Sequence, residues 1–188
     1  MVAGRTSVIR ISVAFTAVVL IAASWILIAL SRHGLEVRKV ESGVTPMTFY
    51  AARETRNAPG VIVLHGFGSS RQVMSGFALV LARAGYVALT VDFSGHGTSR
   101  APLDRDGGSL QRDIDRALEL MLEQPQVDNA RIALLGHSMG SGAAMRAAIR
   151  NPERVAATVA VSPTDAEVSR RLPRNLLLMA GTWEERFQ

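Results

Sequence analysis

From residue 60 onward the sequence alternates short apolar runs with segments whose apolar residues recur at helical spacing. A short apolar run between turn residues is typical of a strand buried on both faces. The predicted strands are residues 60–64, 86–91, 131–135, 155–161 and 175–180, the predicted helices are residues 71–83, 110–123 and 139–150, and two earlier strands are predicted at 35–41 and 47–52. Strands that alternate with helices predict an α/β fold with a mostly parallel, doubly wound sheet.

The loop after strand 131–135 carries the strongest motif, Gly136-His137-Ser138-Met139-Gly140, directly before a predicted helix. A serine in this context is typical of a nucleophile elbow, a sharp turn in which neighbouring side chains would clash and glycines relieve the crowding. We therefore predict Ser138 as a nucleophile, with the Met139 N–H at the start of the helix available to bind an oxyanion. The alternative is a glycine-rich turn with an incidental serine.

A second motif, His65-Gly66-Phe67-Gly68, follows strand 60–64. A glycine-rich loop at this position can present a further backbone N–H, that of Phe67, to the same oxyanion. A phosphate-binding loop is the competing interpretation, but the sequence contains neither a P-loop nor a dinucleotide-binding glycine pattern. We expect His65 to be a structural hydrogen-bonding residue rather than a base.

A third motif follows strand 86–91 and runs Asp92-Phe93-Ser94-Gly95-His96-Gly97-Thr98-Ser99. Asp92 and His96 are two residue types that form catalytic pairs. We favour a different interpretation, in which the side chains of Asp92 and Ser99 hold a glycine-rich turn by hydrogen bonds to its backbone.

The three motifs, in this order and at these strand ends, resemble the α/β-hydrolase fold family over residues 35–188. The resemblance implies a serine hydrolase that cleaves an ester, thioester or amide bond through an acyl-enzyme on Ser138, without metal or organic cofactor. It also implies an acid after a late strand. Glu184 stands where the family usually has aspartate, and Asp165 is the alternative acid.

The sequence departs from the family in its histidines, which are His33, His65, His96 and His137. None stands after a final strand, where the family places its base, so we expect the catalytic histidine to be missing from this chain and the domain to be incomplete at its C-terminus. The alternative function is a non-catalytic binding or scaffold module with the same fold. Residues 163–174 are too few for the family's lid domain, which predicts an open site.

The N-terminal segment 11–30 contains no charged residue and only three polar ones. At about 1.5 Å per residue it would span about 30 Å, the thickness of a bilayer's hydrocarbon core. We predict a single-pass membrane anchor over residues 1–34, followed by the hydrolase domain over 35–188. A cleaved signal peptide, whose apolar region should be shorter, and a buried core helix are the alternatives. Basic flanks of nearly equal charge specify topology weakly, and we expect the domain on the extracytoplasmic side.

The charge and composition exclude several other classes of function. The net charge is +5, but the basic residues are scattered rather than clustered, so no nucleic-acid partner is predicted. The chain has no cysteine, which excludes disulfides, a cysteine nucleophile and cysteine-based zinc sites. The partners that remain are a membrane and a small-molecule or peptidyl acyl substrate.

Overall fold

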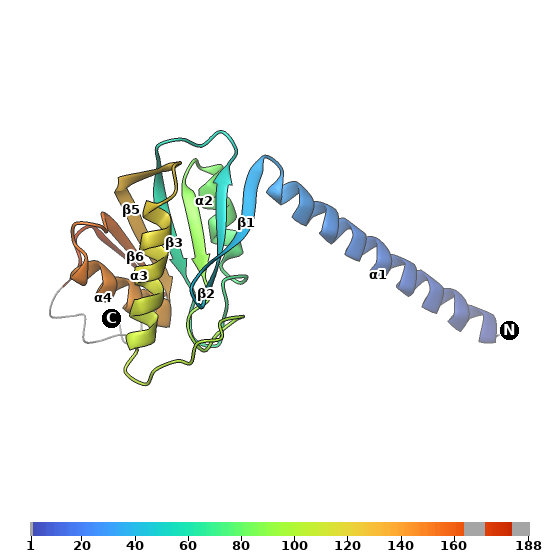
Figure 1. Ribbon diagram of the computed structural model, residues 1–188. Helices are drawn as coiled ribbons and strands as arrows, with labels where there is room; N and C mark the ends of the chain where they lie inside the picture. The colour runs from blue at the N-terminus through green and yellow to red at the C-terminus, as the bar shows by residue number, and fades with distance from the viewer. Residues whose placement is uncertain (1, 164–171, 182–188) are drawn as a thin grey trace. The chain divides into compact units, whose positions relative to one another are not determined.

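The computed structural model describes residues 2–163 and 172–181 and shows a long helix and an α/β domain (Figure 1). Contacts between residues divide the chain into two units, Met1–Gly34 and Leu35–Gln188. The first unit consists of helix α1 (Val2–Arg32). Its segment Arg10–Arg32 contains an 18-residue window with a mean hydropathy of 2.6 and no buried residue. By length and composition, α1 is therefore long and apolar enough to cross a membrane.

The second unit is built on a seven-stranded sheet with the order β1-β2-β4-β3-β5-β6-β7. The strands are β1 (Leu35–Ser42), β2 (Thr45–Ala52), β3 (Ala58–Leu64), β4 (Val87–Val91), β5 (Val127–His137), β6 (Ala157–Val161) and β7 (Leu176–Met179). The β1–β2 hairpin is antiparallel and joins β4 in antiparallel pairing, whereas every pairing from β4 to β7 is parallel. The predicted mostly parallel sheet is confirmed.

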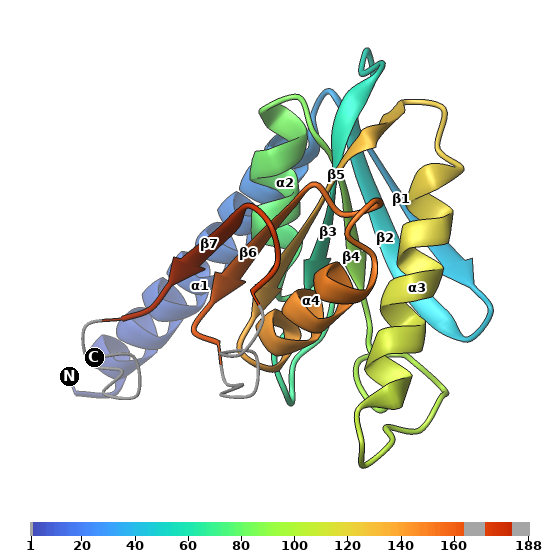
Figure 2. The same ribbon diagram turned by 90° about the vertical axis from the view of Figure 1, so that its left-hand side faces the viewer.

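Helices cover both faces of this sheet, which confirms the doubly wound prediction (Figure 2). Helix α2 (Ser75–Arg83) lies on one face, and α3 (Gly108–Leu122) and α4 (Met139–Arg150) lie on the other. The sequence of β3 explains the division, since alternate side chains point to opposite faces. Val61 and Val63 contact the α2 side, and Ile62 and Leu64 join the core under α3 and α4.

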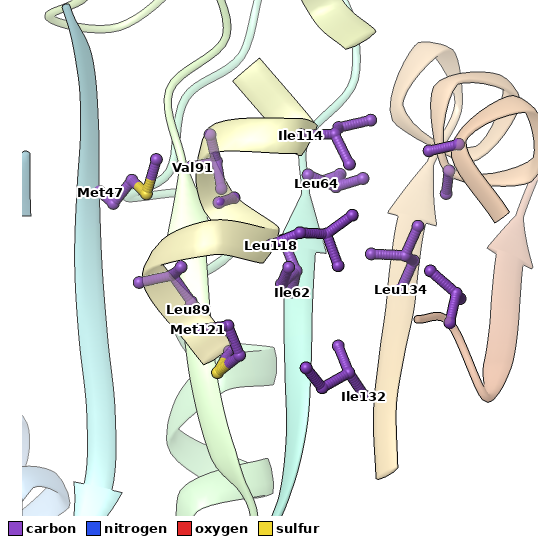
Figure 3. Close-up of a cluster of buried hydrophobic side chains, with 14 of the residues drawn as sticks. Met47, Ile62, Leu64, Leu89, Val91, Ile114, Leu118, Met121, Ile132 and Leu134 are labelled. Carbon is purple, nitrogen blue, oxygen red and sulfur yellow. The ribbon is translucent and has the colours of Figure 1, made fainter. Parts of the chain in front are cut away.

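The largest hydrophobic cluster lies between the sheet and the face of α3 (Figure 3). Ile114, Leu118 and Met121 recur at helical spacing along α3 and have almost no exposed surface. They meet Ile62 and Leu134 from the central strands. Burying each such side chain contributes about 1.5–3 kcal/mol, so this layer fixes the strands whose ends carry the motifs.

Two predicted boundaries differ from the structure by four residues, and the others agree within two. The helix expected at 71–83 begins at Ser75. Residues 71–74 instead form turns whose backbone hydrogen bonds join residues three apart, such as the bond from the Ser75 N–H to the Gln72 carbonyl oxygen (3.1 Å). The strand expected at 131–135 begins earlier, at Val127, because Val127 pairs with Ala58 of β3. Both differences depend on contacts with residues distant in the sequence, since the Arg71 N–H in the turn before α2 donates to the Asp92 carboxylate (2.7 Å).

Candidate active site

Ser138 lies between β5 and α4 in the sharp turn that the sequence predicts. Its backbone has φ 52° and ψ −119°, a strained conformation for a residue with a side chain. It occupies the N-cap position of α4, but its side chain makes no capping hydrogen bond. Within the described part of the chain the Ser138 hydroxyl forms no hydrogen bond, and the residue is partly exposed.

Gly136 and Gly140 permit the turn because backbone atoms occupy the space where their side chains would lie. A Cβ on Gly140 would come within 2.5 Å of the His65 carbonyl oxygen. A Cβ on Gly136 would overlap the Gly140 carbonyl group and approach the Ser141 Cα to 2.5 Å. The helix start therefore packs directly on the end of β3, and only glycine fits at either position.

The His65–Gly68 loop lies beside Ser138, as expected for two parts of one site. A Cβ on Gly66 would lie 3.2 Å from the Ser138 Cβ and 3.1 Å from the His137 Nδ1. Phe67 follows at once, and its side chain is 75% exposed. The Met139 N–H is in the first turn of α4, where backbone donors have no partner within the helix. Ser138 thus lies next to both segments from which oxyanion donors are predicted.

His65 is buried and both of its ring nitrogens are occupied by the backbone. The Phe93 N–H donates to Nε2 (3.1 Å), so Nδ1 carries the proton and donates to the Gly66 carbonyl (2.7 Å). Burial lowers the pKa of His65 below its ordinary value of 6.5, against the raising effect of the Gly66 bond. A neutral histidine fixed in this way joins two loops, as expected for a structural residue.

Asp92 is fully buried and holds the third motif in place. It accepts hydrogen bonds from the backbone N–H groups of Thr98 (2.8 Å) and Arg71 (2.7 Å), and it forms an ion pair with the Arg71 guanidinium. The His96 ring instead lies beside the Ser94 backbone, with its Nδ1 3.0 Å from the Ser94 carbonyl oxygen. The carboxylate therefore positions backbone, in agreement with the interpretation preferred from the sequence, although Arg71 was not anticipated.

The sequence analysis also missed Asp113, a buried carboxylate on α3. It accepts hydrogen bonds from the Ser94 N–H (2.7 Å) and the Thr45 hydroxyl (2.6 Å), and Arg116 lies 3.2 Å away. Asp113 therefore ties the third motif to α3 and β2. Its position in the sequence could have indicated this role, because Asp113 directly precedes Ile114 and is itself among the buried residues of α3.

A cluster of aromatic rings connects the second and third motifs at the carboxyl ends of the strands. The Phe67 and His96 rings meet edge to face at 5.4 Å, and the His96 and His65 rings are 5.2 Å apart. His137 is exposed at the end of β5, and His33 belongs to the first unit. The two predicted acids, Glu184 and Asp165, lie outside the described residues, as does most of the segment expected to lack a lid.

Comparison with known proteins identifies the class to which this fold and site belong. A hydrolase family model described as "Serine aminopeptidase, S33" matches residues 56–187, and the chain belongs to this family of α/β hydrolases. The resemblance seen in the three motifs is thereby confirmed.

Individual relatives agree with this assignment. The chain is 31% identical over 117 residues to the sn-1-specific diacylglycerol lipase ABHD11 of Mus musculus, covering 62% of this chain and 36% of the lipase. It is 28% identical over 116 residues to Cutinase 2 of Thermobifida cellulosilytica, covering 58% of this chain and 42% of the cutinase. The chain thus spans less than half of the length of these curated relatives.

Solved structures share the fold. A hypothetical protein from Pseudomonas aeruginosa matches with a TM-score of 0.62 at 22% identity, over 72% of this chain and 45% of that chain. An epoxide hydrolase from Vigna radiata matches with a TM-score of 0.53 at 25% identity, over 69% of this chain and 40% of that chain. The first of these likenesses shows the fold alone.

Proposed function

We propose that this chain belongs to a membrane-anchored serine hydrolase that cleaves an ester, thioester or amide bond through an acyl-enzyme on Ser138. The observation that supports this most is the conformation of Ser138. A residue with positive φ, enclosed by close backbone packing at Gly136 and Gly140, carries a hydroxyl with no partner among the described residues. Strain of this kind is costly and collects at functional sites.

In the proposed reaction, Ser138 Oγ attacks the substrate's carbonyl carbon while its proton passes to a general base. The carbonyl π electrons move to oxygen, and the N–H groups of Phe67 and Met139 donate hydrogen bonds to the resulting oxyanion. The carbonyl then re-forms, and the alcohol, thiol or amine leaves with the proton from the base. Water attacks the acyl group on Ser138 by the same steps and releases the acid.

The base is proposed to be a histidine from outside these 188 residues. In the described part of the chain, no histidine forms a hydrogen bond with Ser138. His65 uses both ring nitrogens, and His96 has Nδ1 beside the Ser94 carbonyl. We assign the acid that orients the base to Glu184, with Asp165 as the alternative, because either carboxylate can orient an imidazole.

We further propose that α1 anchors the protein in a membrane with the hydrolase domain on the extracytoplasmic side. The length and apolar character of Arg10–Arg32 support an anchor. A domain held at a bilayer suggests an acyl substrate that occurs there, and the similarity to a diacylglycerol lipase and a cutinase favours an ester.

The experiment that tests this function is covalent labelling of the natural full-length protein with a fluorophosphonate. We expect labelling at Ser138, because only an activated serine reacts. Ser138→Ala should abolish labelling and lower the hydrolysis of short activated esters by at least about 10³-fold. The thermal midpoint should not fall, since the strained serine makes no hydrogen bond through its side chain in the described structure.

The matched control is Ser69→Ala, which alters another serine in the neighbouring loop and should retain labelling. Absence of labelling in the full-length protein would instead support the non-catalytic binding or scaffold module. The non-catalytic alternative is supported by His65, because both of its ring nitrogens form hydrogen bonds with backbone groups.

A further inference from the structure

The peptide unit between Gly66 and Phe67 carries two polar groups in different environments. The carbonyl oxygen of the buried Gly66 accepts hydrogen bonds from His65 Nδ1 (2.7 Å) and from the Ser69 N–H (3.3 Å). Within the described residues, the Phe67 N–H forms no hydrogen bond. The peptide is planar and trans, so its C=O and N–H point in opposite directions. The groups that hold the Gly66 carbonyl therefore also set the direction of the Phe67 N–H.

This peptide unit lies next to the proposed nucleophile. A Cβ on Gly66 would come within 3.2 Å of the Ser138 Cβ. The N–H of Met139, at the start of α4, likewise has no hydrogen-bond acceptor in the part of the chain that the structure describes. Two backbone donors without a protein acceptor thus lie on segments that meet at Gly66, which is the arrangement that an oxyanion hole requires.

The His65 ring is itself held by a series of hydrogen bonds that ends on α3. Its Nε2 accepts the Phe93 N–H (3.1 Å), and the next N–H of the backbone, that of Ser94, donates to the Asp113 carboxylate (2.7 Å). The Phe93 ring also meets the imidazole edge to face, with 5.1 Å between the ring centroids. All four of these residues are buried. The imidazole is therefore fixed with Nδ1 directed at the Gly66 carbonyl.

We propose that His65 and Asp113 are positioning residues that direct the Phe67 N–H toward the oxyanion. The inference rests on the proposed serine hydrolase activity and deepens it. Neither side chain takes part in the chemistry. Asp113 holds the backbone at residues 93–94, this backbone holds the imidazole, and the imidazole holds the Gly66 carbonyl. The N–H of the same peptide unit is thereby turned toward the oxyanion beside Ser138.

The readout that tests this proposal is a ratio of two turnover numbers in the natural full-length protein. One substrate is a short activated ester, and the other is its thionoester, in which sulfur replaces the carbonyl oxygen. Sulfur is a weak hydrogen-bond acceptor, so N–H donors stabilise the transition state of the thionoester far less. The ratio of kcat for the ester to kcat for the thionoester therefore reports the oxyanion donors. Partial unfolding of a variant lowers both values equally and leaves their ratio unchanged.

Two amide substitutions separate the two hydrogen bonds of His65. His65→Asn places an amide nitrogen close to the position of Nδ1 and keeps a donor for the Gly66 carbonyl. His65→Gln places its amide near the position of Nε2, so it keeps an acceptor for the Phe93 N–H and loses that donor. We expect His65→Gln to lower the ratio at least tenfold, which is part of the roughly 10²–10³-fold contribution of a whole oxyanion donor. His65→Asn should lower it by less than about threefold, because the donor is kept.

Asp113 is tested by a conservative rescue. Asp113→Ala removes the acceptor of the Ser94 N–H and should lower the ratio, whereas Asp113→Asn still offers an oxygen to that N–H and should restore it. The matched control is Asp115→Ala, which removes a partly exposed carboxylate of the same helix and should leave the ratio unchanged. An unchanged ratio in Asp113→Ala would overturn the role of Asp113.

The remaining outcomes separate this inference from the proposed function. Equal ratios in His65→Gln, His65→Asn and the native protein would overturn the positioning role of His65 and leave the acyl-enzyme on Ser138 in place. The same loss in both His65 variants would overturn the assignment to the Gly66 bond. Failure of the native protein to turn over either substrate would overturn the serine hydrolase itself, and this inference with it.

Discussion

At Gly140, one added methyl group would meet the carbonyl oxygens of His65 (2.5 Å) and Leu64 (2.7 Å). These are backbone atoms of a central strand and its loop, so they cannot move aside as a side chain would. We predict that Gly140→Ala lowers the free energy of unfolding by about 3 kcal/mol. Urea denaturation followed by circular dichroism measures the change.

Gly76 is the matched control for this prediction. It is exposed on α2, and a Cβ there would have no atom within 4 Å. Gly76→Ala should raise stability by about 0.5–1 kcal/mol, because alanine favours the helical backbone. Equal losses at Gly76 and Gly140 would show that the close packing around the elbow is not the cause.

His65 should make stability depend on pH. Because burial lowers its pKa in the folded protein, the unfolded chain binds the proton more readily. The neutral side chain is fully compatible with folding above its ordinary pKa of 6.5. As the pH falls below that value, the unfolded state gains protons first and stability decreases.

The measurement is the denaturation midpoint between pH 7.5 and 5.5 for the native chain and for His65→Gln. Glutamine can accept the Phe93 N–H bond but does not titrate in this range. The variant should be less stable at pH 7.5 and should lose less stability on acidification. Parallel slopes for the two proteins would contradict the assignment of a neutral, structural His65.

At the scale of elements, Asp92 links the turn after β4 to the turn before α2. Asp92→Asn would leave the buried Arg71 guanidinium without its charge partner. We predict a loss of about 3 kcal/mol or more. Asp128→Asn is the control, because the Asp128–Arg131 pair is exposed to solvent and should contribute far less to stability. Similar losses for both variants in urea denaturation would disprove a special role for the Asp92 network.

The sequence predicted the elements whose signals are local. The buried strands, the amphipathic helix α3 and the elbow around Ser138 follow from short patterns of apolar residues and glycine. The start of α2 could not be predicted from such a local pattern, because Arg71 is held in a turn by Asp92, which lies 21 residues further along the chain. Asp113 was missed for the same reason, since its partners come from β2 and from the turn after β4.

The candidate site was predictable to a similar extent. The motifs predicted that the segments with Ser138 and Phe67 would bind the same oxyanion, and the structure brings those segments close together at Gly66. The hydrogen bond between His65 and Phe93 could not be predicted from the sequence, because a bond to a distant backbone group produces no local sequence pattern. The roles of Ser138, Phe67, Met139 and Glu184 stay predictions.

At the scale of the whole molecule, two forces could hold this chain at a membrane, and salt distinguishes them. A basic surface is screened at high ionic strength, whereas an apolar span buried in hydrocarbon is not. The net charge is only +5, and Arg10–Arg32 alone is long enough to cross the bilayer. We therefore expect the apolar anchor, rather than surface charge, to hold the chain at the membrane.

The prediction is that the expressed chain sediments with membranes and stays there after washes with 1 M salt and with carbonate, because roughly 20 apolar residues inserted in lipid are not released by either treatment. Deleting residues 1–32 should move the protein to the supernatant, since the deletion removes the apolar span. N-terminal sequencing of the membrane-bound protein is the control. A mature N-terminus near Ser31 would show a cleaved signal peptide, and release of the intact chain by salt alone would show that charge, rather than α1, holds it at the membrane.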